Sequence, residues 1–286
     1  MRQIEIKNCS YTYQPGTINS HQALYDINLA VDAGELIAII GHGGSGKSTL
    51  ALLLAGLFVP GSGTVTIGDG NIPPEQLFRE VGLVFQYPEH QLFAQNVFEE
   101  VAFGARNAGV AEDYLPIKVR QSLETVGLDP DQYWYSSPFE LSGGQKRRVC
   151  IASLLAIDPG IVILDEPTAG LDAVGKKWMK ALISSLNQQG KTVIWISHDM
   201  SEVAELARRV IVLEQGRIIL DGDTADIFSC EDQLAASGLE IPHAARLVRE
   251  LKAKGVPIPG KAVTVSGAVS YTHLDVYKRQ VWPWIR

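Results

Sequence analysis

The segment from residue 41 to residue 49 reads Gly41-His42-Gly43-Gly44-Ser45-Gly46-Lys47-Ser48-Thr49. It has the pattern G-x4-G-K-[ST] of a phosphate-binding loop, in which glycines let successive backbone N–H groups point at phosphate oxygens. The apolar run 35–40 before it predicts a buried strand, and residues 50–55 after it favour a helix. A glycine turn ahead of an ordinary helix is the plainer interpretation, but strand, loop and helix start in this order favour nucleotide binding.

Two side chains of this loop carry the expected chemistry. Lys47 would bridge the β- and γ-phosphates of the nucleotide, and the Ser48 hydroxyl would ligate Mg²⁺. The helix N-terminus that follows would add its partial positive charge. The remaining residues of the loop that we expect to contact the nucleotide are Gly41, Gly43, Gly44, Ser45, Gly46 and Thr49.

Length and composition leave room for one large α/β domain with a small appendage, or for two modest domains. Of the 286 residues, 46% are hydrophobic and 20% are charged, as in a soluble globular protein. The longest apolar stretch, 50–59, is about half of the ~20 residues that span a bilayer, and the N-terminus has no secretory h-region. Three scattered cysteines suggest neither disulfides nor a metal cluster, and the net charge of −7 argues against a nucleic-acid surface. We expect a cytosolic protein that reaches a membrane only through a partner.

The rest of the chain alternates strands and helices. Patterns of alternating polarity predict strands at 3–13, 24–32 and 63–68, and a hairpin at 210–213 and 217–220. Continuous apolar runs are typical of a parallel sheet covered on both faces, and they occur at 81–85, 161–164 and 192–196. Helices are expected mainly within 96–157, with breaks at Pro116, Gly127 and Pro130, then at about 174–188, and from Ile241 to a stop at Gly255 and Pro257.

Two carboxylates end the predicted strand 161–164. Asp165 and Glu166 therefore lie at the sheet edge where open α/β sheets bind ligands. Asp165 would hold Mg²⁺, usually through water, and Glu166 would polarise the attacking water as a general base. Asp-Glu-Pro is also good turn chemistry, but beside a phosphate-binding loop the catalytic interpretation is favoured.

Three further side chains are candidates for the same site. His198 follows the strand 192–196, and its place beside the expected γ-phosphate favours a catalytic role over the commoner structural one. Gln86 follows the strand 81–85, and its amide oxygen could reach the metal or the water. Tyr13, ahead of the phosphate-binding loop, is either an adenine-stacking residue or a half-buried strand tyrosine, and the two interpretations weigh equally.

A second glycine-rich segment, Leu141-Ser142-Gly143-Gly144-Gln145, precedes a helix that begins basic and turns apolar. Its serine and glutamine form the pattern of a capping box, worth about 1 kcal/mol. A capping box needs no glycines at its centre, however, and two bare glycines would let a phosphate approach this helix N-terminus. The basic run Lys146-Arg147-Arg148 that follows is interpreted as a solvated face, the commoner fate of such charges.

The phosphate-binding loop, Leu-Ser-Gly-Gly-Gln, Ile-Leu-Asp-Glu-Pro-Thr and a strand-ending histidine, in this order, resemble the ATP-binding-cassette (ABC) ATPases. The resemblance covers about residues 1–230 and implies an α/β fold with a P-loop NTPase (RecA-like) core. An antiparallel β subdomain and an α-helical signature subdomain, at about 87–160, would complete it. The resemblance further implies that two ATPase subunits pair head to tail around two ATP molecules with Mg²⁺. Residues Ser142, Gly143, Gly144 and Gln145 would then contact the ATP of the opposite chain, and Asp172 matches the loop that links the two sites.

A narrower match is to the ATPase subunits of energy-coupling factor (ECF) transporters, which import vitamins or cobalt and nickel ions into bacteria. It rests on the segments 86–93 (QYPEHQLF), 101–104 (VAFG), 137–140 (SPFE) and 167–172 (PTAGLD). It implies a heterodimer of related ATPases and a C-terminal helical dimerisation appendage at 231–260. The tail 261–286 continues no recognisable pattern and is of doubtful origin.

The same resemblance implies membrane partners. The chain would lie on the cytoplasmic face of the bacterial cell membrane, held there by a transmembrane coupling subunit and accompanied by a substrate-binding membrane subunit. Helices of the coupling subunit would enter a groove after Gln86. The candidates for its surface are Tyr87, Pro88, Leu92, Phe93 and Phe103, for which core burial within the helical subdomain is the other interpretation.

Other functions fit less well. A conventional ABC importer ATPase is the nearest alternative, and the segment 88–93 and the C-terminal features separate it from this chain. A cassette ATPase that acts on DNA would carry a coiled-coil or zinc insertion, and residues 49–140 show neither heptads nor paired cysteines. Translation-associated cassette proteins carry two cassettes in one chain, whereas one is present here. We therefore expect no nucleic-acid partner.

Overall fold

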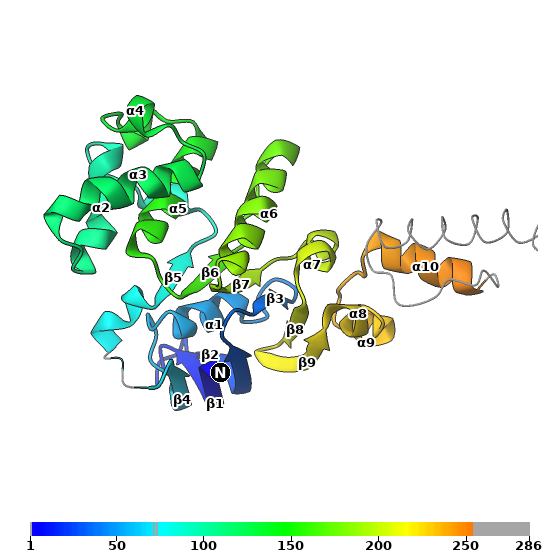
Figure 1. The fold of residues 1–286 in the computed structure, drawn as a ribbon. Coiled ribbons are helices and arrows are strands. Elements are labelled where there is room, and N and C mark those ends of the chain that lie inside the picture. The colour runs from blue at the N-terminus through cyan, green and yellow to red at the C-terminus, as the bar shows by residue number, and fades with distance from the viewer. Residues whose placement is uncertain (1, 71, 73, 254–286) are drawn as a thin grey trace, which may run out of the picture.

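A six-stranded sheet forms the centre of the computed structural model, which describes residues 2–70, 72 and 74–253 (Figure 1). Its strands lie in the order β5-β6-β7-β3-β8-β9. The first five are parallel to one another, and β9 returns antiparallel to β8 as the hairpin that the sequence predicts. The strands are β3 (Leu36–Ile40), β5 (Val81–Val84), β6 (Ile161–Asp165), β7 (Thr192–Ile196), β8 (Arg209–Glu214) and β9 (Arg217–Asp223).

A second, three-stranded antiparallel sheet has the order β2-β1-β4. It consists of β1 (Arg2–Tyr13), β2 (His21–Asp32) and β4 (Ser62–Ile67), so the alternating patterns of the sequence are confirmed as strands. Helix α1 (Lys47–Leu54) contributes apolar side chains to a core cluster that contains buried residues of this sheet and of the main sheet.

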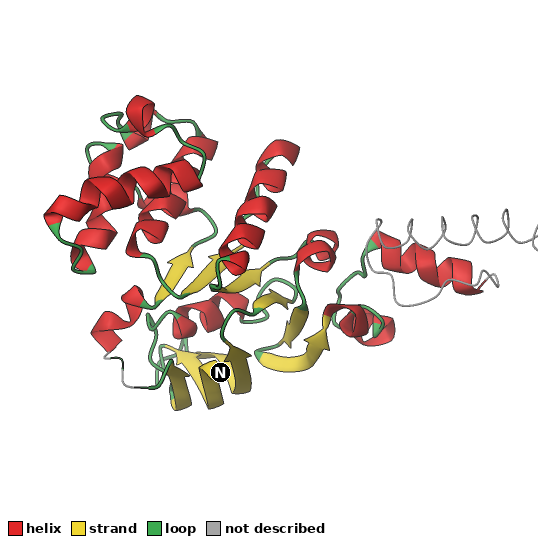
Figure 2. Ribbon diagram, in the orientation of Figure 1, coloured by secondary structure: helices red, strands yellow, loops and turns green. Residues whose placement is uncertain are grey.

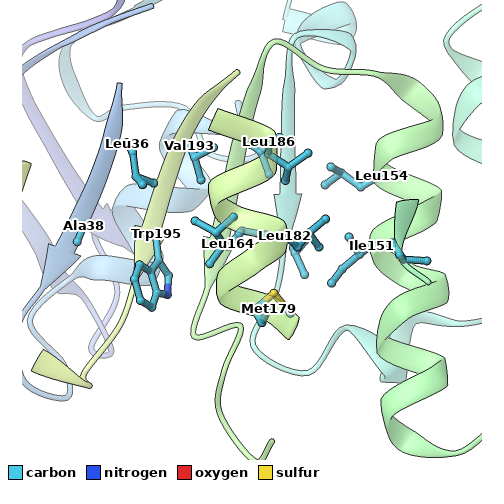
Figure 3. Packing of buried hydrophobic residues seen from close by; sticks show 14 of the residues in the cluster. Leu36, Ala38, Ile151, Leu154, Leu164, Met179, Leu182, Leu186, Val193 and Trp195 are labelled. Carbon is cyan, nitrogen blue, oxygen red and sulfur yellow. The ribbon is translucent and has the colours of Figure 1, made fainter. Parts of the chain in front are cut away.

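Alternate residues of the central strands enter two different hydrophobic clusters. In β3, Ile37 and Ile39 join the cluster that contains α1 and the antiparallel sheet, whereas Leu36, Ala38 and Ile40 join a cluster on the other face. Successive side chains of a strand point to opposite faces, so a strand buried on both sides reads as a continuous apolar run. The second cluster includes Trp195 of β7 and residues of α6 (Ala173–Gln188) and α5 (Gly143–Ile157), as Figure 3 shows.

Residues 97–157 form the helical subdomain, which lies to one side of the main sheet and contacts β5 through α5 (Figure 2). It comprises α2 (Val97–Asn107), α3 (Leu115–Thr125), α4 (Pro130–Tyr133) and α5, with the 3-10 turns η3 (Glu112–Tyr114) and η4 (Pro138–Glu140). Pro116 was expected to break a helix, but it is the second residue of α3, because a proline in the first turn forfeits no intrahelical hydrogen bond. Two further 3-10 turns, η1 (Pro74–Arg79) and η2 (Pro88–Gln91), flank β5.

The C-terminal part adds short helices that the sequence patterns did not predict. These are α7 (Met200–Leu206), α8 (Thr224–Ile227) and α9 (Glu231–Ala236), and they are followed by the expected last helix, α10 (His243–Ala253). Leu234, Leu239 and Ile241 are buried in the same cluster as the main sheet, so hydrophobic contact continues across residue 230, where we expected the cassette to end. The helix stop expected at Gly255 and Pro257 and the tail 261–286 lie outside the described residues.

Candidate functional site

Three loops that carry candidate residues meet at one edge of the main sheet. Strands β6, β7 and β3 are adjacent and parallel, so their carboxyl ends lie side by side. The phosphate-binding loop follows β3, Glu166 follows β6, and His198 lies two residues beyond β7. This topology brings together residues that are more than 150 positions apart in the sequence.

The phosphate-binding loop has a backbone that requires glycine. Gly46, the residue before α1, has φ +103°, and a Cβ added there would lie 2.8 Å from the carbonyl oxygen of Ala23. Gly44 also has a positive φ, of +77°, but a Cβ at Gly44 or at Gly43 would meet no atom of the described chain within 4 Å. The backbone at Gly43 and Gly44 is therefore open to an approaching phosphate, whereas the backbone at Gly46 packs against Ala23 and Leu24 of β2.

Lys47 holds its ammonium over this loop. Its Nζ donates hydrogen bonds to the carbonyl oxygens of Gly41 (2.8 Å) and His42 (2.9 Å). Burial lowers the pKa of Lys47, and the nearby carboxylates of Glu166 and Asp165 oppose that shift. Among the described residues, Lys47 forms no ion pair closer than 4 Å, so its charge is available to an anionic ligand.

Glu166 and His198 form a close pair in front of the loop. The two side chains are 2.6 Å apart, between Oε2 of Glu166 and Nδ1 of His198. The Glu166 side chain is 12% exposed and the His198 side chain 71% exposed. Burial raises the pKa of Glu166, which the contact with His198 partly offsets. A raised pKa suits a carboxylate that accepts a proton from water.

The backbone at Glu166 is unusual for a residue with a side chain. Its φ is +51°, in the left-handed region, where a non-glycine residue stores strain of order 1–3 kcal/mol. Its N–H nevertheless donates to the carbonyl oxygen of Ile196 on β7, so the sheet holds the turn in place. The strained turn aims the carboxylate at His198.

Asp165 and Ser48, the predicted metal ligands, lie against each other. Asp165 is 7% exposed, and burial raises its pKa above the usual range. A hydrogen bond from the Ser48 hydroxyl offsets part of that rise. A carboxylate and a hydroxyl are the hard oxygen ligands that Mg²⁺ prefers, so the donor set fits this ion. Gln86 is exposed two residues beyond β5, at the outer strand of the same edge.

A cleft of about 580 Å³ opens beside Lys47 and the Glu166–His198 pair, whereas Ser48, Asp165 and Gln86 do not line it. Its lining includes Gly41, Gly43, Lys47, Glu166 and His198, which the sequence predicted to act together. The cleft also has a wall that the sequence did not predict, formed by 199–201 and by 238–241 with His243. The wall carries no motif, and only the fold shows that the C-terminal segment returns to the phosphate-binding loop.

The segment 142–145, called here the glycine tip, begins helix α5. Ser142 and Gln145 form a full capping box: the Ser142 N–H donates to Gln145 Oε1 (2.9 Å), and the Gln145 N–H donates to the Ser142 hydroxyl (3.4 Å). Gly143 and Gly144 are exposed, and a Cβ at either would meet nothing within 4 Å among the described residues. The glycine tip does not line the cleft that holds Lys47.

Two other predicted nucleotide ligands have partners within the chain. Asp172 caps α6, because its Oδ1 accepts from the N–H of Gly175 at 2.7 Å. The Tyr13 hydroxyl is 3.0 Å from the Thr49 hydroxyl, and the Tyr13 ring contacts Phe58 edge to face. Tyr13 is half-buried at the end of β1, so the structural interpretation accounts for its surroundings.

Two of the three charges in the basic run at the start of α5, Arg147 and Arg148, have partners within the fold. Arg147 is 5% exposed and bonds to Glu89, and Arg148 donates to the carbonyl oxygens of Val126 and Gly127 and stacks on Trp178. The prediction of a solvated face was wrong for these two residues because their partners lie 20 or more residues away along the chain, beyond the reach of a local pattern.

Comparison with known proteins places the chain in a family. Residues 24–169 match the model of the ABC transporter family. The chain is 44% identical to the energy-coupling factor transporter ATP-binding protein EcfA2 of Clostridium perfringens, over 93% of this chain and 95% of that protein. It is 42% identical to EcfA2 of Streptococcus sanguinis, over 92% and 96%.

Solved structures agree with these matches. CbiO1 of Clostridium perfringens, described as part of the ABC transporter complex cbiONQ, superposes with a TM-score of 0.72 at 33% identity, covering 87% of this chain and 99% of that one. The ATP-binding cassette MJ0796, in a dimeric post-hydrolysis state with ADP and Pi, superposes with a TM-score of 0.67 at 28% identity, covering 77% and 98%.

Fold and site thus define an ABC ATPase, which binds and hydrolyses ATP. Within that class, the chain belongs to the family of energy-coupling factor transporter ATP-binding proteins.

Proposed function

We propose that this chain is an ATPase subunit of an ECF transporter on the cytoplasmic face of a bacterial membrane. It pairs with a second, related ATPase chain around ATP and Mg²⁺, and the pair drives vitamin or transition-metal uptake through a coupling subunit and a substrate-binding membrane subunit. The family membership and the 44% identity to an ECF ATP-binding protein support this assignment over a conventional ABC importer. In the part of the chain that the structure describes, no helix has the length and apolar character to cross a bilayer.

The glycine tip carries the proposal. It is a helix N-terminus with two bare glycines, the arrangement that binds a phosphate, yet it has no share in the cleft of its own chain. A triphosphate seated on Lys47 of the partner chain would give the glycine tip a ligand. ATP would then join the two chains, and loss of the γ-phosphate would part them.

Hydrolysis would depend on residues at the sheet edge. Glu166 accepts a proton from the attacking water, and the contact at 2.6 Å with His198 orients it. Lys47 neutralises charge on the β- and γ-phosphates. Ser48 and Asp165 would hold Mg²⁺, which would supply further charge neutralisation when bound.

An apolar groove between the helical subdomain and the segment around β5 is the proposed binding site of the coupling subunit. It has a volume of about 370 Å³ and is lined by aromatic side chains that include Phe85, Phe93 and Phe103. Phe93 and Phe103 are 58% and 47% exposed, and their rings meet edge to face at 4.8 Å. Two other candidates, Pro88 and Leu92, are buried, so core packing accounts for them. Exposed apolar side chains gathered in one groove are typical of a protein interface.

Association in the presence of ATP tests the pairing. The variant Glu166→Gln, in which hydrolysis is blocked, should sediment as a pair with ATP and Mg²⁺ and as single chains without them. Lys47→Ala in the same background should stay unpaired, because it removes the charge that holds the triphosphate. Single chains at saturating ATP, both alone and with a co-expressed second ATPase, would refute the proposal.

Co-purification tests the groove. Phe93→Ser should reduce the amount of coupling subunit that co-purifies with this chain, because it removes apolar area from the groove. Tyr135→Ser is the control, since Tyr135 is an exposed aromatic side chain of the helical subdomain (86% exposed) that does not line the groove. Equal loss in both variants would contradict the assignment of this groove.

A further inference from the structure

Arg147 is a buried arginine with partners on two separate segments. Its side chain is 6% exposed. Nε and Nη2 donate to the carboxylate of Glu89 at 3.4 and 3.3 Å, and Nη1 donates to the carbonyl oxygens of Pro167 (3.3 Å) and Ala169 (2.8 Å). A guanidinium presents its donors in a rigid planar fork, so these contacts fix the positions of their acceptors relative to one another.

The first of these segments leads into the groove. Glu89 belongs to η2, which begins two residues after Gln86 and precedes Phe93. A second contact from α5 holds η2 as well, because the Cys150 thiol donates to the carbonyl oxygen of Pro88 at 3.1 Å. Movement of η2 would therefore be passed to α5.

The second segment follows the catalytic carboxylate. Pro167 is the residue after Glu166, and Ala169 accepts from Arg147 within the turn that leads to Asp172. The N–H of Ala169 donates to the carbonyl oxygen of Glu166 at 3.1 Å, which closes a turn that begins at the strained residue Glu166. Because Arg147 donates to two carbonyl oxygens of this turn, it fixes the position of the turn relative to α5. Arg148, by contrast, bonds within the helical subdomain and stacks on Trp178, with no contact to this turn.

We infer that Arg147 is a positioning residue for Glu166, through which the segment beside the groove sets the placement of the catalytic turn. This inference rests on the proposed function, because it requires that a partner occupies the groove. Arg147 lies about one turn into α5, the helix that begins with the glycine tip. The same helix would therefore present the glycine tip to the ATP of the partner chain. One side chain thus joins the groove segment, the glycine-tip helix and the turn after Glu166.

The test compares ATP turnover by the purified transporter complex containing Arg147→Lys, Glu89→Gln, or both. Lysine keeps the charge but loses the fork, and glutamine keeps an acceptor oxygen but loses the charge. We expect kcat to fall about 10- to 100-fold, as for a small misplacement of a catalytic group. The KM for ATP should stay within about twofold, because the phosphate-binding loop is untouched, and the double variant should be no slower than the slower single variant.

The matched control is Arg120→Lys, because Arg120 pairs with Asp131 at 2.8 Å on the exposed surface of the same subdomain. It should leave both kcat and KM unchanged. Wild-type kcat in both Arg147→Lys and Glu89→Gln, or fully additive losses in the double variant, would overturn the inference while leaving the proposed function intact. If Arg147→Lys does not fold, Glu89→Gln alone decides, with the same criteria. A wild-type complex that neither pairs nor hydrolyses ATP would instead refute the proposed function.

Discussion

Replacing Gly144 by alanine should raise the stability of this chain and weaken its pairing. Gly144 is the second residue of α5, it is exposed, and a Cβ there would meet no described atom within 4 Å. Alanine exceeds glycine in helix propensity by up to about 1 kcal/mol in a helix interior. In the first turn we expect about half of that, which corresponds to a rise in Tm of about 1–2 °C for a chain of this size.

The same methyl group should obstruct the ligand of the glycine tip. It would occupy the space through which the partner's triphosphate approaches the backbone N–H groups of α5. A hydrogen bond to a charged group contributes about 1.5–3 kcal/mol. Loss of one such bond would weaken ATP-dependent association about 10- to 100-fold.

The assay measures both quantities on one background. Thermal unfolding without nucleotide reports stability, and sedimentation with ATP and Mg²⁺ in Glu166→Gln protein reports pairing. Gly82→Ala is the contrasting variant, because its Cβ would lie 2.7 Å from Leu154 Cγ inside the core. It should cost about 1–3 kcal/mol of stability without altering the association of the folded protein. If Gly144→Ala pairs with ATP as tightly as its parent, the reasoning about the glycine tip is wrong.

Three other substitutions test the site and its support. Glu166→Gln should slow turnover about 10²- to 10⁴-fold. Burial raises the pKa of Glu166 in the folded protein above its ordinary 4.5, so the folded state binds this proton more tightly than the unfolded state does. The stability that the bound proton contributes is fully present below pH 4.5 and is lost as the pH rises through the folded pKa. The free energy of unfolding of the glutamine variant should therefore exceed that of the wild type by more at pH 8 than at pH 4, and a difference that stays constant with pH would contradict this. Wild-type turnover should fall in acid at a pH above 4.5, and a profile flat to that pH would exclude Glu166 as the base. Gly46→Ala forces a Cβ to 2.8 Å from the carbonyl oxygen of Ala23 and should abolish ATP binding by calorimetry; unchanged affinity would show that the loop tolerates the strain. Trp178→Leu removes the ring that lies 4.4 Å from the Arg148 guanidinium and should cost about 1–2 kcal/mol in urea unfolding, whereas an unshifted midpoint would make this contact neutral.

The parts of the fold that local patterns determine could be predicted from the sequence. The continuous apolar runs of β6 and β7 indicated buried parallel strands, and parallel strands place their carboxyl ends at one edge. That argument alone put Glu166 and His198 beside Lys47, and the structure places all three in one cleft. The catalytic and ligand roles of these residues stay predictions until the variants are measured.

What the sequence could not show depends on contacts between distant segments. Arg147 reads as one charge in a basic run, and nothing near it indicates that its partner is Glu89, 58 residues earlier. Helix α7 is seven residues long and is set by Asp199, whose side chain caps it at 3.1 Å, a signal too short for a periodicity argument. The return of 238–243 to the cleft has no local signature at all.

The shared wall of the cleft limits how cassettes of this type can be recombined. Because 238–241 and His243 face Lys47 and His198 across the same cavity, the helices beyond β9 are not a detachable module. A chimaera joined at residue 230 would exchange one side of this cavity along with the C-terminal helices, and would replace the buried residues Leu234 and Ile241. Grafts that aim to change only the assembly properties of the C-terminus should therefore place their junction after His243.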